Sequence, residues 1–134
     1  MAQAVREGVE SVEGVVAVCR KASDATLEDL LACHGLVLGT PENFGYMSGA
    51  LKDFFDRTYD DARGHVLRKP YVVFISAGND GSGALNSIER IACGYQFRKV
   101  YEPVIARGAL KDDVLARCRE LGQTLAAGCE AGIY

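Results

Sequence analysis

The sequence predicts an α/β fold in which helices cover both faces of a parallel sheet, and three observations support this. Short apolar runs alternate with segments of helical periodicity along the chain. The runs Leu36–Leu38 and Tyr71–Ser76 are apolar at nearly every residue, as is typical of strands buried on both faces. Each of these runs ends in a loop of small and polar residues that leads directly into a helix.

The bulk composition indicates one globular domain, residues 1–134, with a small-molecule rather than a polyanionic partner. The chain has 134 residues, of which 49% are hydrophobic and 25% charged. A net charge of -3 and a pI of about 5.4 favour neither nucleic acid nor an anionic membrane as partner. No apolar run approaches the roughly 20 residues of a membrane span, and the first residues lack the pattern of a signal peptide.

The five cysteines argue against both a disulfide framework and a zinc site. Their number is odd, and no C-x-x-C spacing occurs. We expect them to be small core residues of a protein in the reducing cytoplasm.

The first half of the chain is predicted to contain two helices and two strands. Residues 2–12 carry apolar side chains at spacings of three and four, which indicates a helix. The β-branched run Val15–Val18 predicts a strand. Thr26, with an acid three residues later, resembles a capping box that opens a short helix, which Gly35 is placed to end. The next strand is Leu36–Leu38.

Predicted helices and strands continue to alternate in the second half of the chain. A broad apolar face predicts the helix Ala50–Tyr59, whose acids Asp53 and Asp56 are expected to be solvated and to pair with Lys52 and Arg57. The remaining predicted elements are the strand Tyr71–Ser76, a helix from Leu85 to Tyr95, the strand Lys99–Ile105, in which Pro103 suits an edge position, and the helix Val114–Cys129.

The loop Gly39–Gly49 is the strongest candidate for a binding site. Ligands of open α/β sheets bind outside the carboxyl ends of the strands, and this loop follows such an end. Phe44 and Tyr46 supply two aromatic rings, and Gly45 allows close approach of the backbone to a partner. We interpret it as a loop against which a flat aromatic cofactor lies; the alternative is that one ring belongs to the core and the other to the surface.

Residues 39–57 resemble the isoalloxazine-binding loop and following helix of the flavodoxin-like FMN reductases and quinone reductases that use NAD(P)H. In that family a strand ends in Gly-(Thr/Ser)-Pro, and an aromatic and glycine loop then leads to a helix with Leu-Lys-x-Phe-x-Asp-Arg. Gly39–Pro41 and Leu51–Arg57 match these motifs. The loop Ser76–Gly83 resembles the other flavin loop of the family more loosely. The resemblance implies a flavodoxin-like three-layer α/β/α fold with strand order 2-1-3-4-5.

The resemblance also implies a function. FMN would receive hydride from NAD(P)H and pass electrons to a quinone or another small acceptor. Alternatives are a flavodoxin-type electron carrier and a flavin-free domain kept for assembly. No order of residues typical of nucleophilic catalysis stands out, and no metal site is expected. Aromatic residues expected on the surface of the helix Ala50–Tyr59 favour a homo-oligomer. The implied cofactor-binding residues are Thr40, Pro41, Glu42, Asn43, Phe44, Gly45, Ser76, Ala77, Gly78, Asn79, Gly81 and Gly83.

The sequence departs from the family pattern at its beginning. The family starts with a strand and a phosphate loop rich in Ser, Thr and Gly, and the first helix follows. Here the sequence begins inside what corresponds to that helix. Three explanations stand: the natural start lies upstream; the Val15 run or an exchanged strand in a swapped dimer takes the vacant position; or the protein is a member that no longer binds FMN well.

Overall fold

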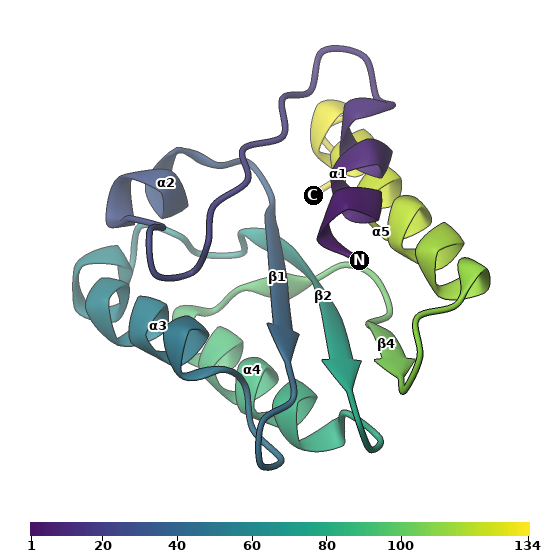
Figure 1. Ribbon diagram of the computed structural model, residues 1–134. Coiled ribbons are helices and arrows are strands. Elements are labelled where there is room, and N and C mark those ends of the chain that lie inside the picture. Colours follow the sequence, from purple (N-terminus) through teal and green to yellow (C-terminus); the bar gives the residue numbers. More distant parts are fainter.

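The computed structural model describes residues 1–134, which form five helices and four strands (Figure 1). In chain order these are α1 (Ala2–Glu10), α2 (Leu27–Ala32), β1 (Leu36–Pro41), α3 (Gly49–Ala62), β2 (Pro70–Ala77), α4 (Ser82–Tyr95), β3 (Arg98–Lys99), β4 (Val104–Arg107) and α5 (Asp112–Glu130). None of the helices has both the length and the apolar character needed to cross a bilayer.

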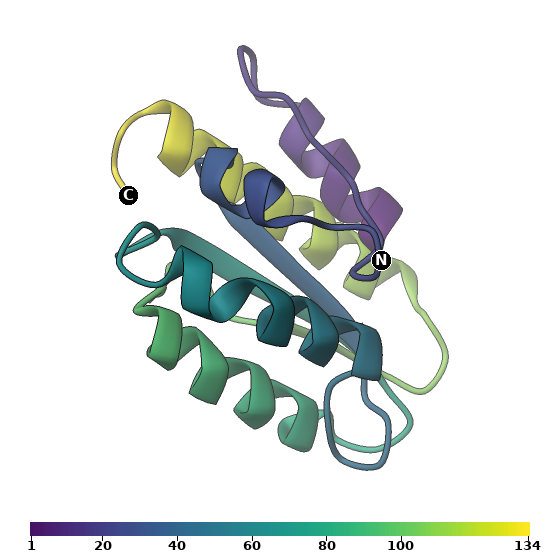
Figure 2. The ribbon, with the colours of Figure 1, turned by 90° about the vertical axis from the view of Figure 1, so that its left-hand side faces the viewer.

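A parallel sheet with β2 at its centre forms the middle layer. One edge of β2 pairs with β1 in a register from Leu36 opposite Tyr71 to Pro41 opposite Ser76. The other edge pairs first with β3 and then with β4. Figure 2 shows α1 and α5 on one side of the sheet and α3 and α4 on the other. The predicted α/β fold with a parallel sheet is therefore confirmed.

Two apolar cores, one on each face, hold the layers together. Alternate side chains of β2 enter them: Tyr71, Val73 and Ile75 face α3 and α4, whereas Val72 and Phe74 face α1 and α5. This central strand is buried on both sides, which is why its sequence is apolar at consecutive positions. The parallel pairing brings the carboxyl ends of β1, β2 and β4 to the same edge of the sheet.

Two strand predictions need correction. Val15–Val18 forms no regular element, because none of the backbone groups of residues 16–20 is hydrogen-bonded to another backbone group. β-propensity yields a strand only where a neighbouring strand offers pairs. The predicted strand Lys99–Ile105 is divided into β3 and β4, with residues 100–103 outside the ladder. Pro103 lies at this interruption and has no N–H to donate.

The burial of the cysteines and aromatic residues also differs from expectation. Cys118 alone is fully buried, whereas Cys19 and Cys93 are exposed. Phe54 and Phe55 of α3 lie in the core rather than on the surface, so they offer no aromatic surface for a homo-oligomer.

The exposed face of α3 carries two ion pairs, as predicted. Lys52 contacts Asp56 at 2.6 Å and Arg57 contacts Asp53 at 2.6 Å. Arg57 also donates to the carbonyl oxygens of Ala22 and Ala25, at 3.0 and 3.1 Å, and so ties α3 to the connection that precedes α2.

Two glycines allow α1 and α5 to approach each other closely. A Cβ atom at Gly8 would overlap the carbonyl oxygen of Arg119, and one at Gly122 would overlap that of Val5. The two helices therefore pack backbone against backbone. This contact holds the first turn of α1 near the carboxyl edge of the sheet.

We predict that Gly122→Ala destabilises the protein by about 1–3 kcal/mol, because the added methyl forces the helices apart in a packed core. Urea unfolding followed by far-UV circular dichroism measures the loss. Gly49→Ala is the matched control: it lies in the first turn of α3 with no atom within 4 Å of its would-be Cβ. An unchanged unfolding midpoint in Gly122→Ala would contradict the close packing.

Candidate functional site

A hollow of about 430 Å³ lies at the carboxyl edge of the sheet. The ends of three strands and the first residues of α1 form its wall. This volume lies within the range of roughly 300–1,000 Å³ that is usual for cofactor sites. The lining residues are Met1, Ala2, Gly39, Thr40, Pro41, Phe74, Ser76, Ala106, Gly108 and Leu110.

The first loop, between β1 and α3, is held in shape by its own polar groups. The Ser48 backbone N–H donates to the Thr40 hydroxyl at 2.9 Å, and this hydroxyl donates to the Pro41 carbonyl at 2.8 Å. The Ser48 hydroxyl in turn accepts from the Leu51 N–H at 3.2 Å and caps α3. These hydroxyls are used within the loop, so the backbone and the aromatic rings remain its outward groups.

The tip of this loop is a two-residue hairpin. Asn43 and Tyr46 exchange backbone hydrogen bonds of 2.9 and 3.0 Å. The residues between them, Phe44 and Gly45, both have positive φ, at 51° and 69°, as a type I′ turn requires. Phe44 is fully exposed. A bulky residue in this backbone region is unusual and is typical of functional segments that the surrounding structure over-determines.

The second loop, between β2 and α4, is also ordered by local bonds. The Asp80 carboxylate accepts from the backbone N–H of Ser82 at 2.9 Å and from its hydroxyl at 2.8 Å. These bonds stabilise the ionised carboxylate and lower the pKa of Asp80 below its ordinary value. Arg107 at the end of β4 donates to the Asp80 carbonyl at 3.3 Å. The loop is therefore fixed to the strand beside it.

The two loops are tied to each other. The Ala84 N–H in the first turn of α4 donates to the Glu42 carboxylate at 3.1 Å, and the Glu42 N–H donates to the Ser76 carbonyl at 2.8 Å. A Cβ atom at Gly83 would overlap the carbonyl oxygen of Gly45. The N-cap of α4, Gly81, has no side chain to cap the helix, so Glu42 performs this role from the other loop.

The predicted site residues occupy three places at this edge. Thr40, Pro41 and Ser76 line the hollow. Asn43, Phe44 and Gly45 form the hairpin tip, whereas Glu42 faces α4. In the second loop Gly78 and Asn79 are exposed, and Ala77, Gly81 and Gly83 pack against their surroundings. The last residues of both predicted loops belong to helices, since α3 begins at Gly49 and α4 at Ser82.

Several lining residues were missed from the sequence. Phe74 lies over Gly39, where a Cβ atom would overlap its ring, and both residues line the hollow. The alternation of a strand could have identified Phe74, because it lies two residues before Ser76 and shares its face. Ser87 of α4 was also missed: its buried hydroxyl accepts from the Met47 N–H at 3.2 Å and joins the first loop to α4. No local pattern marks that contact.

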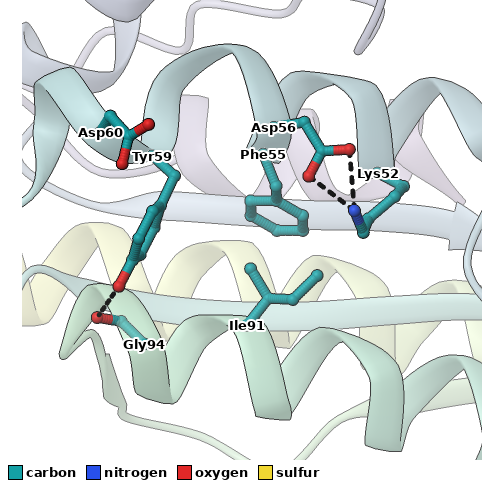
Figure 3. A pocket seen from close by; sticks show the side chains of 7 residues that line it. All are labelled: Lys52, Phe55, Asp56, Tyr59, Asp60, Ile91 and Gly94. Carbon is teal, nitrogen blue, oxygen red and sulfur yellow. Dashed lines mark hydrogen bonds and ion pairs between the residues drawn. The ribbon is translucent and has the colours of Figure 1, made fainter.

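A second hollow, of about 380 Å³, lies between α3 and α4 (Figure 3). Tyr59, whose hydroxyl donates to the Gly94 carbonyl at 3.5 Å, stands on one side of it, and the Lys52–Asp56 pair stands on the other. It contains neither a strand end nor any residue of the two loops. We therefore assign the candidate site to the hollow at the carboxyl edge.

Comparisons with known proteins agree on one family. The sequence model of the family described as NADPH-dependent FMN reductase matches residues 17–98. The chain is 31% identical to a flavodoxin of Aquifex aeolicus over 147 aligned residues, covering 94% of this chain and 77% of that protein. It is 32% identical over 108 residues to an NAD(P)H dehydrogenase (quinone) of Solidesulfovibrio magneticus, covering 62% of this chain. The chain spans about half the length of such dehydrogenases, 53% in this case.

Solved structures share the fold at low sequence identity. A flavodoxin from the domain Archaea superposes with a TM-score of 0.80 at 20% identity, covering 96% of this chain and 87% of that one. The flavodiiron protein from Giardia intestinalis gives 0.82 at 15% identity, covering 97% of this chain and 32% of that one. These similarities identify the fold as flavodoxin-like.

We predict that Glu42→Ala destabilises the protein by about 1 kcal/mol, because the Ala84 N–H in the first turn of α4 loses its side-chain acceptor. Thermal unfolding followed by circular dichroism measures the effect. Glu42→Gln keeps an acceptor oxygen and should retain most of the stability. Ser82→Ala, which removes only the exposed bond from the Ser82 hydroxyl to Asp80 at the start of α4, is the control for losing one exposed hydrogen bond. Equal stability of Glu42→Ala and the wild type would show that this carboxylate does not hold the loops together.

Proposed function

Since the chain belongs to the NADPH-dependent FMN reductase family, we propose that it is an FMN-dependent NAD(P)H oxidoreductase that reduces a quinone or another small acceptor in the cytoplasm. The observation that carries the proposal is the pair of tied loops beside a hollow at the carboxyl edge of the sheet. FMN supplies the hydride and electron chemistry when bound. The protein contributes binding, orientation and exclusion of water.

The residues of the site suit a flat, partly apolar ligand. Phe74 and Leu110 offer apolar walls in the hollow, and the exposed ring of Phe44 at the hairpin tip offers a stacking surface. In this proposal the segments Thr40–Gly45 and Ser76–Gly83 flank the isoalloxazine, mainly through backbone groups. The first turn of α1 opens on the hollow, and its unpaired N–H groups suit an anion such as the flavin phosphate.

A flavodoxin-type electron carrier is the second candidate. The 31% identity to a protein named flavodoxin, over 94% of this chain, favours it. Both functions require bound FMN, and they differ in whether NAD(P)H reduces it. The two candidates are therefore separated by turnover rather than by binding.

We predict that the protein binds FMN and that Phe44→Ala weakens binding. The loss of a stacking ring is worth about 0.5–1.5 kcal/mol, which raises the Kd roughly two- to tenfold. Quenching of flavin fluorescence on titration measures both constants. Leu67→Ala, an exposed apolar residue before β2 at the opposite end of the sheet, should leave the Kd unchanged. Failure of the wild-type protein to bind FMN would reject both candidate functions.

We further predict that the FMN-loaded protein oxidises NADPH in the presence of a soluble quinone. Loss of absorbance at the nicotinamide band, with and without the quinone, measures turnover. An FMN-loaded protein that does not oxidise NADPH, yet is reduced by dithionite and reoxidised by the quinone, would identify the carrier instead. Heat-denatured protein with the same total FMN controls for reduction by free flavin.

A further inference from the structure

The guanidinium of Arg107, the last residue of β4, is held in place but not neutralised. Its Nε atom donates to the Asp80 carbonyl at 3.3 Å, and neither Nη atom has a hydrogen-bond partner. Arg107 belongs to none of the ion pairs of the chain. The Asp80 carboxylate beside it is bonded to Ser82 instead. A guanidinium with one fixed and two free nitrogens presents a fork that matches the oxygens of a phosphate.

Arg107 lies on the face of the sheet opposite the hollow. The side chains of β4 alternate: Ala106 lines the hollow, whereas Ile105 packs against the core beneath α3 and α4. Arg107 comes two residues after Ile105 and therefore shares its face. Gly81 of the second loop lies against Ile105 as well. Arg107 thus stands beside the second loop, away from the first turn of α1, to which we assign the flavin phosphate.

The charged groups around Arg107 favour an anionic ligand. Both acids of the two loops, Glu42 and Asp80, are bonded to the first turn of α4. Lys111, four residues after Arg107, is exposed and belongs to no ion pair. The two aspartates that follow it begin α5, whose N-terminal end stabilises their charge. Two unpaired cations therefore flank residues 108–110, in a chain whose net charge is -3.

We propose that Arg107 binds the 2′-phosphate of NADPH and thereby makes the protein prefer NADPH to NADH, an inference that rests on the proposed function. The nicotinamide meets the isoalloxazine between the two loops, so the adenosine end of the dinucleotide lies outside them. The second loop itself carries no cation. Neighbouring strands lie about 4.8 Å apart, and β4 is the neighbour of β2. Arg107 is therefore the first cation that a dinucleotide crossing the second loop meets.

The 2′-phosphate is the group that distinguishes NADPH from NADH. A phosphate monoester carries about 1.5 to 2 negative charges at pH 7. Its oxygens can accept from both Nη groups of Arg107 at once, whereas the hydroxyl in the same place on NADH offers one uncharged oxygen. The pyrophosphate is common to both nucleotides, so a contact there would not discriminate between them. Discrimination between the two nucleotides is therefore the property that identifies this contact.

Steady-state oxidation of NADPH and of NADH by the FMN-loaded protein, with a soluble quinone as acceptor, tests the proposal. We expect kcat/KM of the wild type to be roughly tenfold or more higher for NADPH. Arg107→Gln keeps an N–H donor for the Asp80 carbonyl but removes the charge, and it should abolish this preference. Arg63→Ala removes an exposed, unpaired arginine at the far end of α3 and should keep it. A wild type that does not prefer NADPH, or an Arg107→Gln variant that loses activity equally with both nucleotides, would overturn the proposal.

A binding measurement separates the failure of this inference from the failure of the proposed function. Adenosine 2′,5′-bisphosphate and 5′-AMP differ by the same phosphate, and isothermal titration calorimetry gives the Kd of each without turnover. The wild type should bind the bisphosphate roughly tenfold more tightly, and Arg107→Gln should bind both alike. A protein that shows this difference but oxidises neither nucleotide would reject the oxidoreductase and retain the phosphate contact.

The opposite outcomes reject the role of Arg107 alone. Turnover of NADPH by a wild type that binds the two adenosine nucleotides equally would overturn the inference and leave the proposed function standing. The Kd for FMN, measured on the same Arg107→Gln variant by fluorescence quenching, excludes the other phosphate of the reaction. A rise in this Kd that matches the loss of NADPH turnover would assign Arg107 to the flavin and overturn the proposal.

Discussion

The parallel pairing of β1 with β2 is the interaction on which the rest of the structure depends. Its register places Pro41 beside Ser76, so both strands end at the same level and both loops leave the sheet side by side. The helices that follow then run back along one face and close the core around Phe55 and Ile88. A slip of one residue would turn the core-facing side chains of the slipped strand toward the opposite face of the sheet. The position of the site is thus a consequence of the register.

The loops convert that placement into a defined surface. In the sequence, the Thr40 hydroxyl and the Glu42 carboxylate resemble ligand-binding groups. In the structure, both form hydrogen bonds that hold the loops in place. What remains outward is backbone, the Phe44 ring and the apolar lining of the hollow. Such a surface suits a planar ligand recognised by stacking and by amide contacts. Recognition of this kind needs no acid or base side chain at the edge of the sheet.

Local sequence patterns predicted most elements because their determinants are local. The Thr26 and Asp29 capping box predicts the start of α2, the apolar face of α3 predicts a helix, and the consecutive apolar residues of β2 predict a buried strand. The contacts that shape the site are different in kind. Ser87 meets Met47 across 40 positions of the chain, and Gly83 meets Gly45 by backbone alone. Neither leaves a periodicity or a motif, so these residues could be found only once the fold was known.

The run Val15–Val18 shows that high β-propensity alone does not produce a strand. Its composition is that of a strand, and its burial alternates as in a strand, yet it has no ladder. Strand formation is a property of a pair, because half of the hydrogen bonds and side-chain contacts belong to the neighbour.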